Sequence, residues 1–281
     1  MKNSKTSSTP KTKRRRGKVF KRVLIGLAVL LVLLIGVLGY ENRHIIYYWW
    51  HGEVVVDRSK YPIVGIDISS HNGDIDFYKV KNNDYSFVII KASEGEDVID
   101  SLFTTNYNRA KANNLKVGAY HYFRKNTDGI NQAKNFVEAV GWRKLDLPLI
   151  IDVEDEINDN VGDDITLKNL NAMIDNLQSR GFKVMIYTNG NGYKRYVKDR
   201  QLINLWLCSF KNPDEIKHIP HQIQQFSHHG RVDGINGDVD LDVFNGNEKQ
   251  WVQWLANAAP LPSDTTTTTN KKEDINHEIS K

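Results

Sequence analysis

A run of apolar residues that ends in carboxylates is the feature of this sequence that points most directly to chemistry. Residues 147–156 read LPLIIDVEDE, so Asp152 and Glu154 directly follow an apolar run. Moving a carboxylate from water into apolar surroundings is costly unless it is paired or gives up its charge. If the run is a β-strand, residues two apart share one face and stand roughly 6–7 Å apart. Asp152 and Glu154 then face one cavity, and Val153 points into the surrounding packing.

Two further segments place carboxylates where they could join this pair. Asp67 lies near the end of IVGIDIS (63–69), and DVDLDVF (238–244) carries aspartates at alternate positions. Carboxylates that are close together repel each other, so at least one should have a raised pKa and keep its proton near neutral pH. A protonated carboxyl beside an ionised one is what glycoside hydrolysis requires. The alternatives are a solvated D-x-E pair and a site for Ca²⁺ or Mg²⁺.

Aromatic residues favour a sugar over a metal-bound phosphate, because flat rings suit the apolar faces of sugars. Packing inside the core is the alternative for each ring. The acidic loop 155–164 does not match the spacing of a calcium-binding loop, and we expect it to be solvated. The aromatic residues that fall late in apolar runs are Tyr120, Tyr122, Tyr187, Trp206 and Phe226.

The carboxylates need a framework of strands that brings them to one place. Several of the apolar segments are continuous rather than alternating, as in strands covered on both faces. We place the acids at the C-terminal ends of these strands, where barrel enzymes hold their active sites. The candidate strands are 63–69, 87–92, 116–123, 149–154, 183–188, 205–210, 221–226 and 238–244.

Helical segments separate most of the earlier strands. The clearest is 166–181, with Thr166 as its N-cap and Gly181 just past its end. Segments 102–114 and 129–140 also predict helices, whereas the last three strands leave little room for any. We therefore predict an α/β fold, an irregular TIM-like (β/α) barrel with eight strands and fewer helices, over residues 61–259. An open doubly wound sheet is the alternative, but no Gly-rich phosphate loop supports it.

The N-terminal region predicts a membrane anchor. Residues 1–22 hold ten Lys or Arg and no acid, and residues 23–40 are eighteen uncharged residues. At about 1.5 Å per residue this stretch spans a hydrocarbon core, and the basic tail places the N-terminus in the cytoplasm. We predict a single-pass signal anchor in the cytoplasmic membrane, a linker over 41–60, and the barrel outside. A cleaved signal peptide is the alternative, although no A-x-A-like site follows Tyr40.

The remaining composition narrows the class of protein. Beyond residue 22 the chain has 28 basic and 34 acidic residues, which argues against a nucleic-acid partner. The single cysteine, Cys208, excludes an intrachain disulfide, and we expect it to be a small buried hydrophobe. Residues 260–281 are polar and of low complexity, and we expect them to be disordered.

Seven motifs in sequence order resemble glycoside hydrolase family 25, the Chalaropsis-type lysozymes or N-acetylmuramidases. They lie between residues 63 and 244 and read GIDIS, FVIIKASEG, GAYHYF, LPLIIDVE, IYTN, LWLCSF and QFSHHGRVDGINGDVDLDVF. Each motif alone is weak, but seven in order over about 180 residues are specific. The resemblance implies an irregular eight-stranded barrel without a cofactor or metal, a monomeric domain that acts on the glycan strands of peptidoglycan.

The resemblance also implies roles for individual residues. Glu154 would be the general acid that protonates the oxygen of the β-1,4 bond between N-acetylmuramic acid and N-acetylglucosamine. Asp152 would stabilise the developing positive charge or orient the substrate's acetamido group as nucleophile. Asp67 and Asp240 complete the catalytic set. The substrate-binding residues would be Tyr120, Tyr122, Tyr187, Trp206 and Gln225.

Three positions depart from the family pattern without removing any of the four acids. Phe226 stands where Tyr is usual, Asp233 where Pro is frequent, and Asp242 where Asn is common. The sequence therefore favours a membrane-anchored muramidase. A non-catalytic wall-binding barrel and a metal-dependent hydrolase are the alternatives.

Overall fold

The chain folds into two compact units, Met1–Gly52 and Glu53–Lys281, each described by itself. In this computed structural model the described residues are 11–41, 46, 53–154, 161–200 and 203–258. Most of the predicted linker before residue 53, the first part of the acidic loop and the predicted disordered tail lie outside the described residues.

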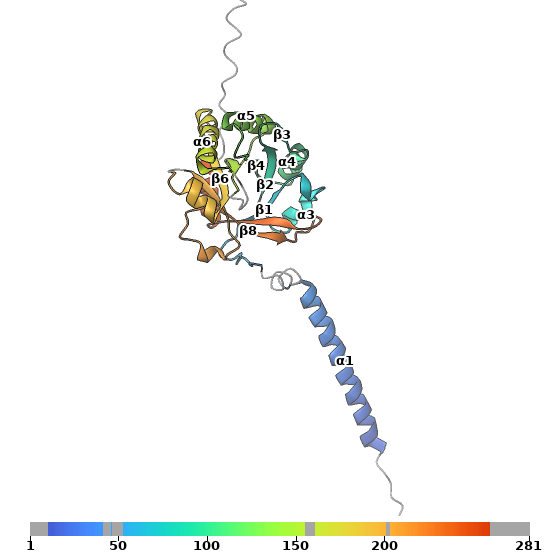
Figure 1. Ribbon diagram of the computed structural model, residues 1–281. Helices are drawn as coiled ribbons and strands as arrows, with labels where there is room; N and C mark the ends of the chain where they lie inside the picture. The colour runs from blue at the N-terminus through green and yellow to red at the C-terminus, as the bar shows by residue number, and fades with distance from the viewer. Residues whose placement is uncertain (1–10, 42–45, 47–52, 155–160, 201–202, 259–281) are drawn as a thin grey trace, which may run out of the picture. The chain divides into compact units, whose positions relative to one another are not determined.

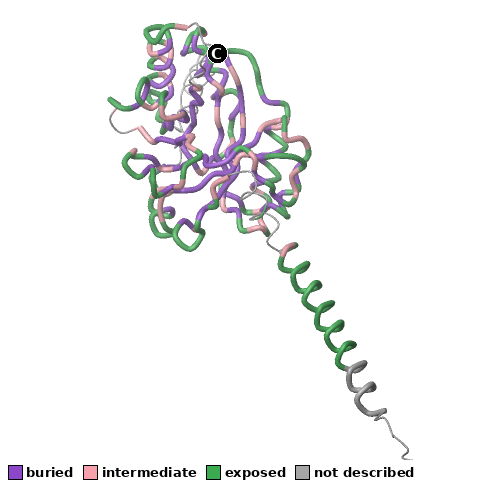
Figure 2. Tube along the Cα trace, turned by 60° about the horizontal axis from the view of Figure 1, so that its bottom comes forward, coloured by how far each residue is buried: buried purple, intermediate pink, exposed green. Residues whose placement is uncertain are grey.

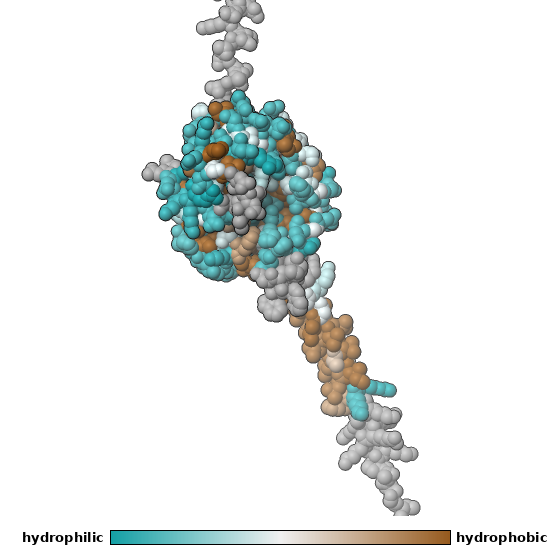
Figure 3. All heavy atoms as spheres, in the orientation of Figure 1, coloured by the Kyte–Doolittle hydropathy of each residue, from teal (hydrophilic) through white to brown (hydrophobic). Residues whose placement is uncertain are grey.

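The first unit contains one long helix, α1 (Lys11–Glu41) (Figure 1). Within it, Phe20–Tyr40 is long and apolar enough to cross a membrane by length and composition, with a mean hydropathy of 2.9 and none of the span buried. Figure 2 shows this stretch as exposed and Figure 3 as hydrophobic. The predicted span 23–40 lies inside it. The helix starts well before that span because Lys and Arg are also good helix formers.

The second unit is an eight-stranded barrel. Its strand order is β1-β9-β8-β7-β6-β5-β4-β2, and pairing between β1 and β2 closes the ring. A further strand, β3, pairs with the end of β2 outside the ring. The strands are β1 (Val64–Ile68), β2 (Phe87–Glu94), β3 (Val98–Ile99), β4 (Lys116–Tyr122), β5 (Leu149–Asp152), β6 (Val184–Asn189), β7 (Asn204–Cys208), β8 (Ile223–Gly230) and β9 (Val239–Phe244).

All eight predicted strands are confirmed, but the last one runs in the opposite direction to its neighbours. β9 is antiparallel to both β8 and β1. Only residues 231–238 connect β8 to β9, and a parallel crossover needs about a dozen residues or more. The chain therefore returns as a hairpin. The expectation that the aspartates of 238–244 lie at the C-terminal end of a parallel strand is wrong, because the start of β9 lies at that end of the barrel.

Fewer helices than strands surround the barrel, as predicted. Each of the first four barrel strands in the chain is followed by an α-helix, and the later connections hold only short helical turns until α8. The helical elements of this unit are η1 (Ser70–Asn72), α3 (Phe77–Asn82), α4 (Phe103–Ala112), α5 (Gly129–Val140), α6 (Asp163–Ser179), α7 (Gly190–Gly192), the π-helix η2 (Tyr193–Val197), η3 (Pro213–Glu215) and α8 (Glu248–Ala258).

The predicted start of α6 is wrong. Thr166 is not the N-cap but a buried residue inside the helix, where its hydroxyl donates to the Gly162 carbonyl at 3.2 Å. Gly162 is the N-cap, and Asp163 and Asp164 occupy the first turn, where negative charge is favourable at the positive end of the helix dipole. The acidic pair thus extends the helix beyond its apolar repeat.

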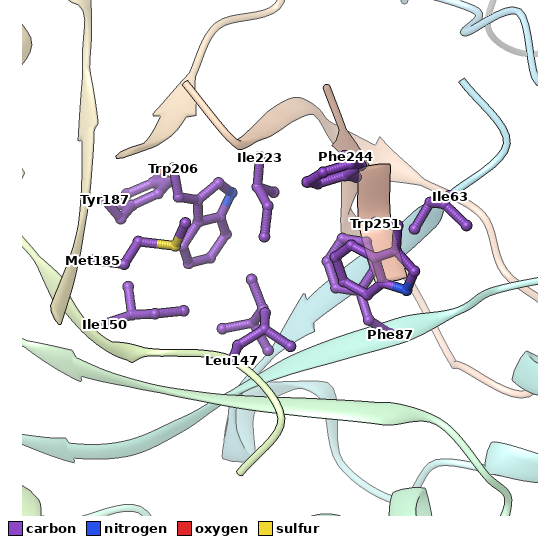
Figure 4. Packing of buried hydrophobic residues seen from close by; sticks show 11 residues of the cluster. Ile63, Phe87, Leu147, Ile150, Met185, Tyr187, Trp206, Ile223, Phe244 and Trp251 are labelled. Atoms are coloured by element: carbon purple, nitrogen blue, oxygen red, sulfur yellow. The ribbon is translucent and has the colours of Figure 1, made fainter. Parts of the chain in front are cut away.

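Aromatic and aliphatic side chains fill the barrel interior (Figure 4). Trp251 of α8 closes one side of this core, with ring centroids 5.3 Å from Phe87 and 5.0 Å from Phe244. Gly65 of β1 is required here, because a Cβ at this position would lie 2.4 Å from the Phe87 ring. The core therefore fixes β1, which carries Asp67, against β2 and β9.

The chain enters the barrel unit through a cluster around Asp214. Its carboxylate accepts from Lys60 Nζ at 2.5 Å and from the Tyr61 hydroxyl at 2.8 Å. Lys217 pairs with the same carboxylate at 2.6 Å. The described part of the predicted linker, residues 53–60, thus ends in direct contact with the loop between β7 and β8.

Candidate active site

Two strands place Asp67 and Asp240 next to each other. Asp67, near the end of β1, is the direct partner of Asp240 in the antiparallel ladder with β9. Asp152 ends β5 and pairs in register with Tyr122 of β4 and Tyr187 of β6. The carboxyl groups therefore reach the same end of the barrel from β1, β5 and β9.

Burial gives these aspartates unusual protonation behaviour. Asp67 and Asp152 are 7% and 6% exposed, and Asp242 is fully buried. Burial, followed by the charges of Asp240 and Asp242, raises the pKa of Asp67 well above its usual range. Burial, followed by the charge of Glu154, likewise raises the pKa of Asp152. The cluster thus keeps protons at pH values where isolated aspartates are ionised, as the sequence predicts.

Asp242 is the site residue that the sequence analysis noted only as a departure. Trp206 Nε1 donates to its Oδ1 at 2.8 Å, and its Oδ2 has no hydrogen-bond donor among the described residues. Asp67 lies within hydrogen-bond reach, and such a bond forms when one of the two carboxyls carries a proton. The alternation of 238–244 could have identified Asp242, because residues 240 and 242 share a face of the strand.

Two linked hydrogen bonds, from Tyr187 to Gln225 and from Gln225 to Asp67, hold the Asp67 carboxyl group. The Tyr187 hydroxyl donates to Gln225 Oε1 at 2.7 Å, and Gln225 Nε2 donates to Asp67 Oδ2 at 2.8 Å. Trp206 is 2% exposed and packs against Tyr187 with ring centroids 4.4 Å apart. Three of the predicted substrate-binding residues are thus buried, and all three connect to the acids through hydrogen bonds.

Glu154 follows β5 and is more accessible than Asp152. Its carboxylate accepts a hydrogen bond from the Tyr122 hydroxyl at 3.1 Å. The residue between the two acids, Val153, is fully buried, and its carbonyl accepts from the Thr188 hydroxyl at 2.7 Å. This placement agrees with the predicted alternation, in which Val153 points into the surrounding packing and the acids face the site. Tyr120 is partly buried, with its ring centroid 6.3 Å from that of Trp206.

Asp238 and Asp240, at the start of β9, are more exposed than the buried acids of the site. Asp238 is exposed and pairs with Arg231 at 2.7 Å and with His229 Nδ1 at 3.1 Å. Burial raises the pKa of Asp240, and the neighbouring His228 opposes that rise. His228 was not identified from the sequence, although it directly follows the QFS motif. Of the three alternating aspartates, only Asp240 is both partly accessible and paired with Asp67.

This arrangement suits acid–base chemistry. Asp152 and Glu154 interact strongly, so one carboxyl of the pair holds a proton in conditions where the other has lost it. Burial raises the pKa of the Cys208 thiol to about 12, so the only cysteine is not a nucleophile at neutral pH. Among the described residues, the carboxyl pair at the end of β5 is one group that could give a proton to a bound molecule.

Comparison with known proteins identifies a family for this barrel. The model of "Glycosyl hydrolases family 25" matches residues 66–235, a range that includes Asp67, Asp152 and Glu154 and ends before Asp240. A family 25 glycosyl hydrolase from Bacillus anthracis has a similar structure, with a TM-score of 0.64 and 31% identity over 72% of this chain and 96% of that one. A bacterial lysozyme from Streptomyces coelicolor gives a TM-score of 0.61 and 28% identity, over 69% of this chain and 97% of that one.

Two curated relatives carry lysozyme names. The autolytic lysozyme of Clostridium acetobutylicum is 36% identical over 185 residues, which are 64% of this chain and 55% of that protein. The chain thus spans about half the length of that relative. Lysozyme M1 of Streptomyces globisporus is 29% identical over 220 residues, 70% of this chain and 72% of that protein.

Proposed function

Because the chain belongs to the glycosyl hydrolases of family 25, we propose that it is a membrane-anchored muramidase. Its substrate is peptidoglycan, and the bond it hydrolyses is the β-1,4 bond between N-acetylmuramic acid and N-acetylglucosamine. The observation that supports this most strongly is the convergence of Asp67, Asp152, Glu154 and Asp240 at one end of the barrel. The lysozyme names of the curated relatives support the same substrate.

In the proposed reaction Glu154 is the general acid. The glycosidic bond between the anomeric carbon and the bridging oxygen breaks, and that oxygen takes the proton of Glu154. Positive charge then develops on the sugar ring, where Asp152 stabilises it or orients the substrate's acetamido group toward the anomeric carbon. Water supplies the hydroxyl group to that carbon, and its other proton returns to Glu154. This assignment is supported by exposure, because Glu154 is accessible at the end of β5 and Asp152 is 6% exposed.

Asp67 and Asp240 serve the same reaction by shaping the electrostatics of the site. Asp240 is partly exposed and lies beside Asp67, which in turn is held by Gln225 at 2.8 Å. A pair of carboxyls in this position binds one proton between them and can give or accept a hydrogen bond at the sugar. We assign substrate binding to Tyr120 and Tyr122 at the same end of the barrel.

The proposed anchor is the apolar stretch Phe20–Tyr40, with the basic N-terminal tail in the cytoplasm and the barrel outside. Eleven residues, 42–52, separate the end of α1 from the barrel unit. Fully extended, they reach about 40 Å at most. The anchored enzyme therefore acts on the part of the wall nearest the membrane.

Mass spectrometry of fragments from defined peptidoglycan tests the activity. We expect fragments with N-acetylmuramic acid at the reducing end. Fragments ending in N-acetylglucosamine would assign the other glycosidic bond, and binding without any release would favour the wall-binding alternative.

Fractionation of cells that express the full chain tests the anchor. We expect the protein to stay in the membrane after alkaline carbonate extraction, with the barrel accessible to protease only from outside. A mature N-terminus located beyond Tyr40 would show a cleaved signal peptide instead.

A further inference from the structure

Two cations contact the ring of Tyr122, and one carboxylate binds both of them. Lys91 Nζ lies 5.1 Å and Arg124 Cζ 5.3 Å from the ring centroid. Glu94 accepts from Lys91 Nζ at 2.6 Å through Oε2 and from Arg124 Nη2 through Oε1. The Lys91 and Glu94 side chains are 15% and 16% exposed, so solvent screens this pair less than a surface ion pair. The four side chains form one connected unit.

A β-bulge makes this unit possible. In a regular strand, residues three apart such as Lys91 and Glu94 point to opposite faces. The pairing between β2 and β4 shifts register between Lys91 and Ser93, which brings Lys91 and Glu94 to the same face. The buried Asn135 of α5 then fixes the end of β2, since its amide donates to the Gly95 carbonyl at 2.9 Å and to the Val98 carbonyl at 3.1 Å.

The unit is directed at the proposed general acid. Tyr122 is the register partner of Asp152, and its hydroxyl reaches past that residue to donate to Glu154 at 3.1 Å. We propose that Lys91, Glu94 and Arg124 form a clamp that positions the Tyr122 hydroxyl and, through it, the Glu154 carboxyl for proton transfer. The inference rests on the proposed function. The three clamp residues act through Tyr122 and are positioning residues, because none of them is assigned to the reacting atoms.

The fold contains a matched control for the clamp. Asp146 also binds two cations, Lys111 at 2.7 Å and Lys116 at 3.3 Å, and its side chain is 18% exposed. The Asp146 carboxylate is about as exposed as that of Glu94 and also binds two cations, but this ion-pair cluster makes no contact with Tyr122 or Glu154 in the described structure. Asp146→Asn therefore measures the cost of losing such a cluster, and Glu94→Gln measures that cost plus the loss of positioning.

A double-mutant cycle on turnover tests the proposal. We expect Tyr122→Phe, which keeps the ring assigned to substrate binding, and Glu94→Gln each to lower kcat about 10- to 100-fold with little change in KM. The double variant should be no slower than Tyr122→Phe alone, because both changes remove the same hydrogen bond to Glu154. Arg124→Lys, which keeps a cation, should recover part of the activity that Arg124→Gln loses. Effects that multiply in the double variant, or a Glu94→Gln loss no larger than that of Asp146→Asn, would overturn the clamp.

A measurement independent of turnover separates the clamp from the proposed function. The ¹³C chemical shift of the Glu154 carboxyl should change in Glu94→Gln as it does in Tyr122→Phe, and should not change in Asp146→Asn. An unchanged shift in Glu94→Gln overturns the clamp even if the wild type hydrolyses peptidoglycan. A wild type that releases no fragments contradicts the proposed function, and the shift still decides whether the clamp holds Glu154.

Discussion

Asp67 and Asp240 are direct partners across the antiparallel pair of β1 and β9, so two carboxyl groups meet at one position of the ladder. Like charges directly opposite each other destabilise a sheet. Here the pair persists because the cluster retains protons, since burial raises the pKa of both residues. The pairing of Asp67 with Asp240, which would destabilise an ordinary sheet, thus gives the site carboxyl groups that can hold protons.

Removing one member of this pair should change the titration of the other. The charge of Asp240 is, after burial, the largest cause of the raised pKa of Asp67. In Asp240→Asn we expect the pKa of Asp67 to fall toward its usual range. A ¹³C titration of the Asp67 carboxyl measures this change. Asp238→Asn, which changes an exposed aspartate of the same strand, is the control and should leave Asp67 as it is. An unchanged Asp67 titration in Asp240→Asn would show that burial and the other carboxylates set its pKa without Asp240.

Replacing the proposed general acid should remove activity and spare the fold. Glu154→Gln keeps the shape of the side chain but holds no proton to give, so hydrolysis of purified walls should fall about 10²- to 10⁴-fold. Circular dichroism and the unfolding midpoint should stay close to those of the wild type. Glu138→Gln, on an exposed position of α5, serves as the control. Near-normal hydrolysis by the Glu154 variant would contradict the assignment.

Asp242→Asn should stabilise the protein near neutral pH. The raised pKa of Asp242 means that the folded state holds a proton which the unfolded state releases, so its contribution to stability is lost as pH rises through the folded pKa. An amide removes this penalty and still accepts from Trp206 Nε1. Asp242→Leu leaves that indole unpaired and should lower the free energy of unfolding by about 1–3 kcal/mol. Urea unfolding at pH 5 and pH 8 measures both, and a destabilised Asn variant would contradict the pKa argument.

His121 should weaken the fold as pH falls. Its Nδ1 faces Ser93 Oγ at 2.8 Å and its Nε2 faces Gln132 Oε1 at 3.2 Å, and burial lowers its pKa to about 4. The unfolded chain binds the proton first, so stability is lost between about pH 6.5 and pH 4, by roughly 3 kcal/mol in total. Unfolding free energies measured across this range should fall less steeply in His121→Gln than in the wild type. Equal slopes would show that carboxyl groups account for the whole pH dependence.

Chelation distinguishes proton transfer from the metal-dependent alternative. The proposed mechanism moves protons between carboxyls and water, so turnover of dialysed enzyme should be the same with and without EDTA. A loss of activity in EDTA that Mg²⁺ or Ca²⁺ restores would favour the metal-dependent hydrolase.

The sequence predicted the strands better than it predicted their directions and contacts. The eight strands were found because each is a short run, either continuously apolar or alternating like DVDLDVF, that is too short for a helix. The reversed direction of β9 was missed, although the segment 231–238 is too short for a crossover to a parallel strand. The start of α6 was misplaced because Thr166 has an N-cap residue type but is buried in the helix.

The clamp could not be predicted, since no feature of KASEG shows that a bulge turns Lys91 and Glu94 to one face. Residue types identify the acids, whereas the partners of those acids depend on register. Asp242 illustrates this difference. Its position two residues after Asp240 was visible in the sequence, but its hydrogen bond with Trp206 was not.

The Asp214 cluster fastens the segment before β1 to the loop between β7 and β8. If the proposed anchor holds one end of the chain and the barrel binds the wall, a pull between them acts on the barrel unit through the segment that precedes β1. That pull reaches Lys60 and Tyr61 before it reaches Val64, the first residue of β1. The hydrogen bonds and ion pairs of Asp214 would then pass part of this force to the loop between β7 and β8 before it reaches β1. In the proposed anchored enzyme, this arrangement would keep strain in the wall from shifting Asp67.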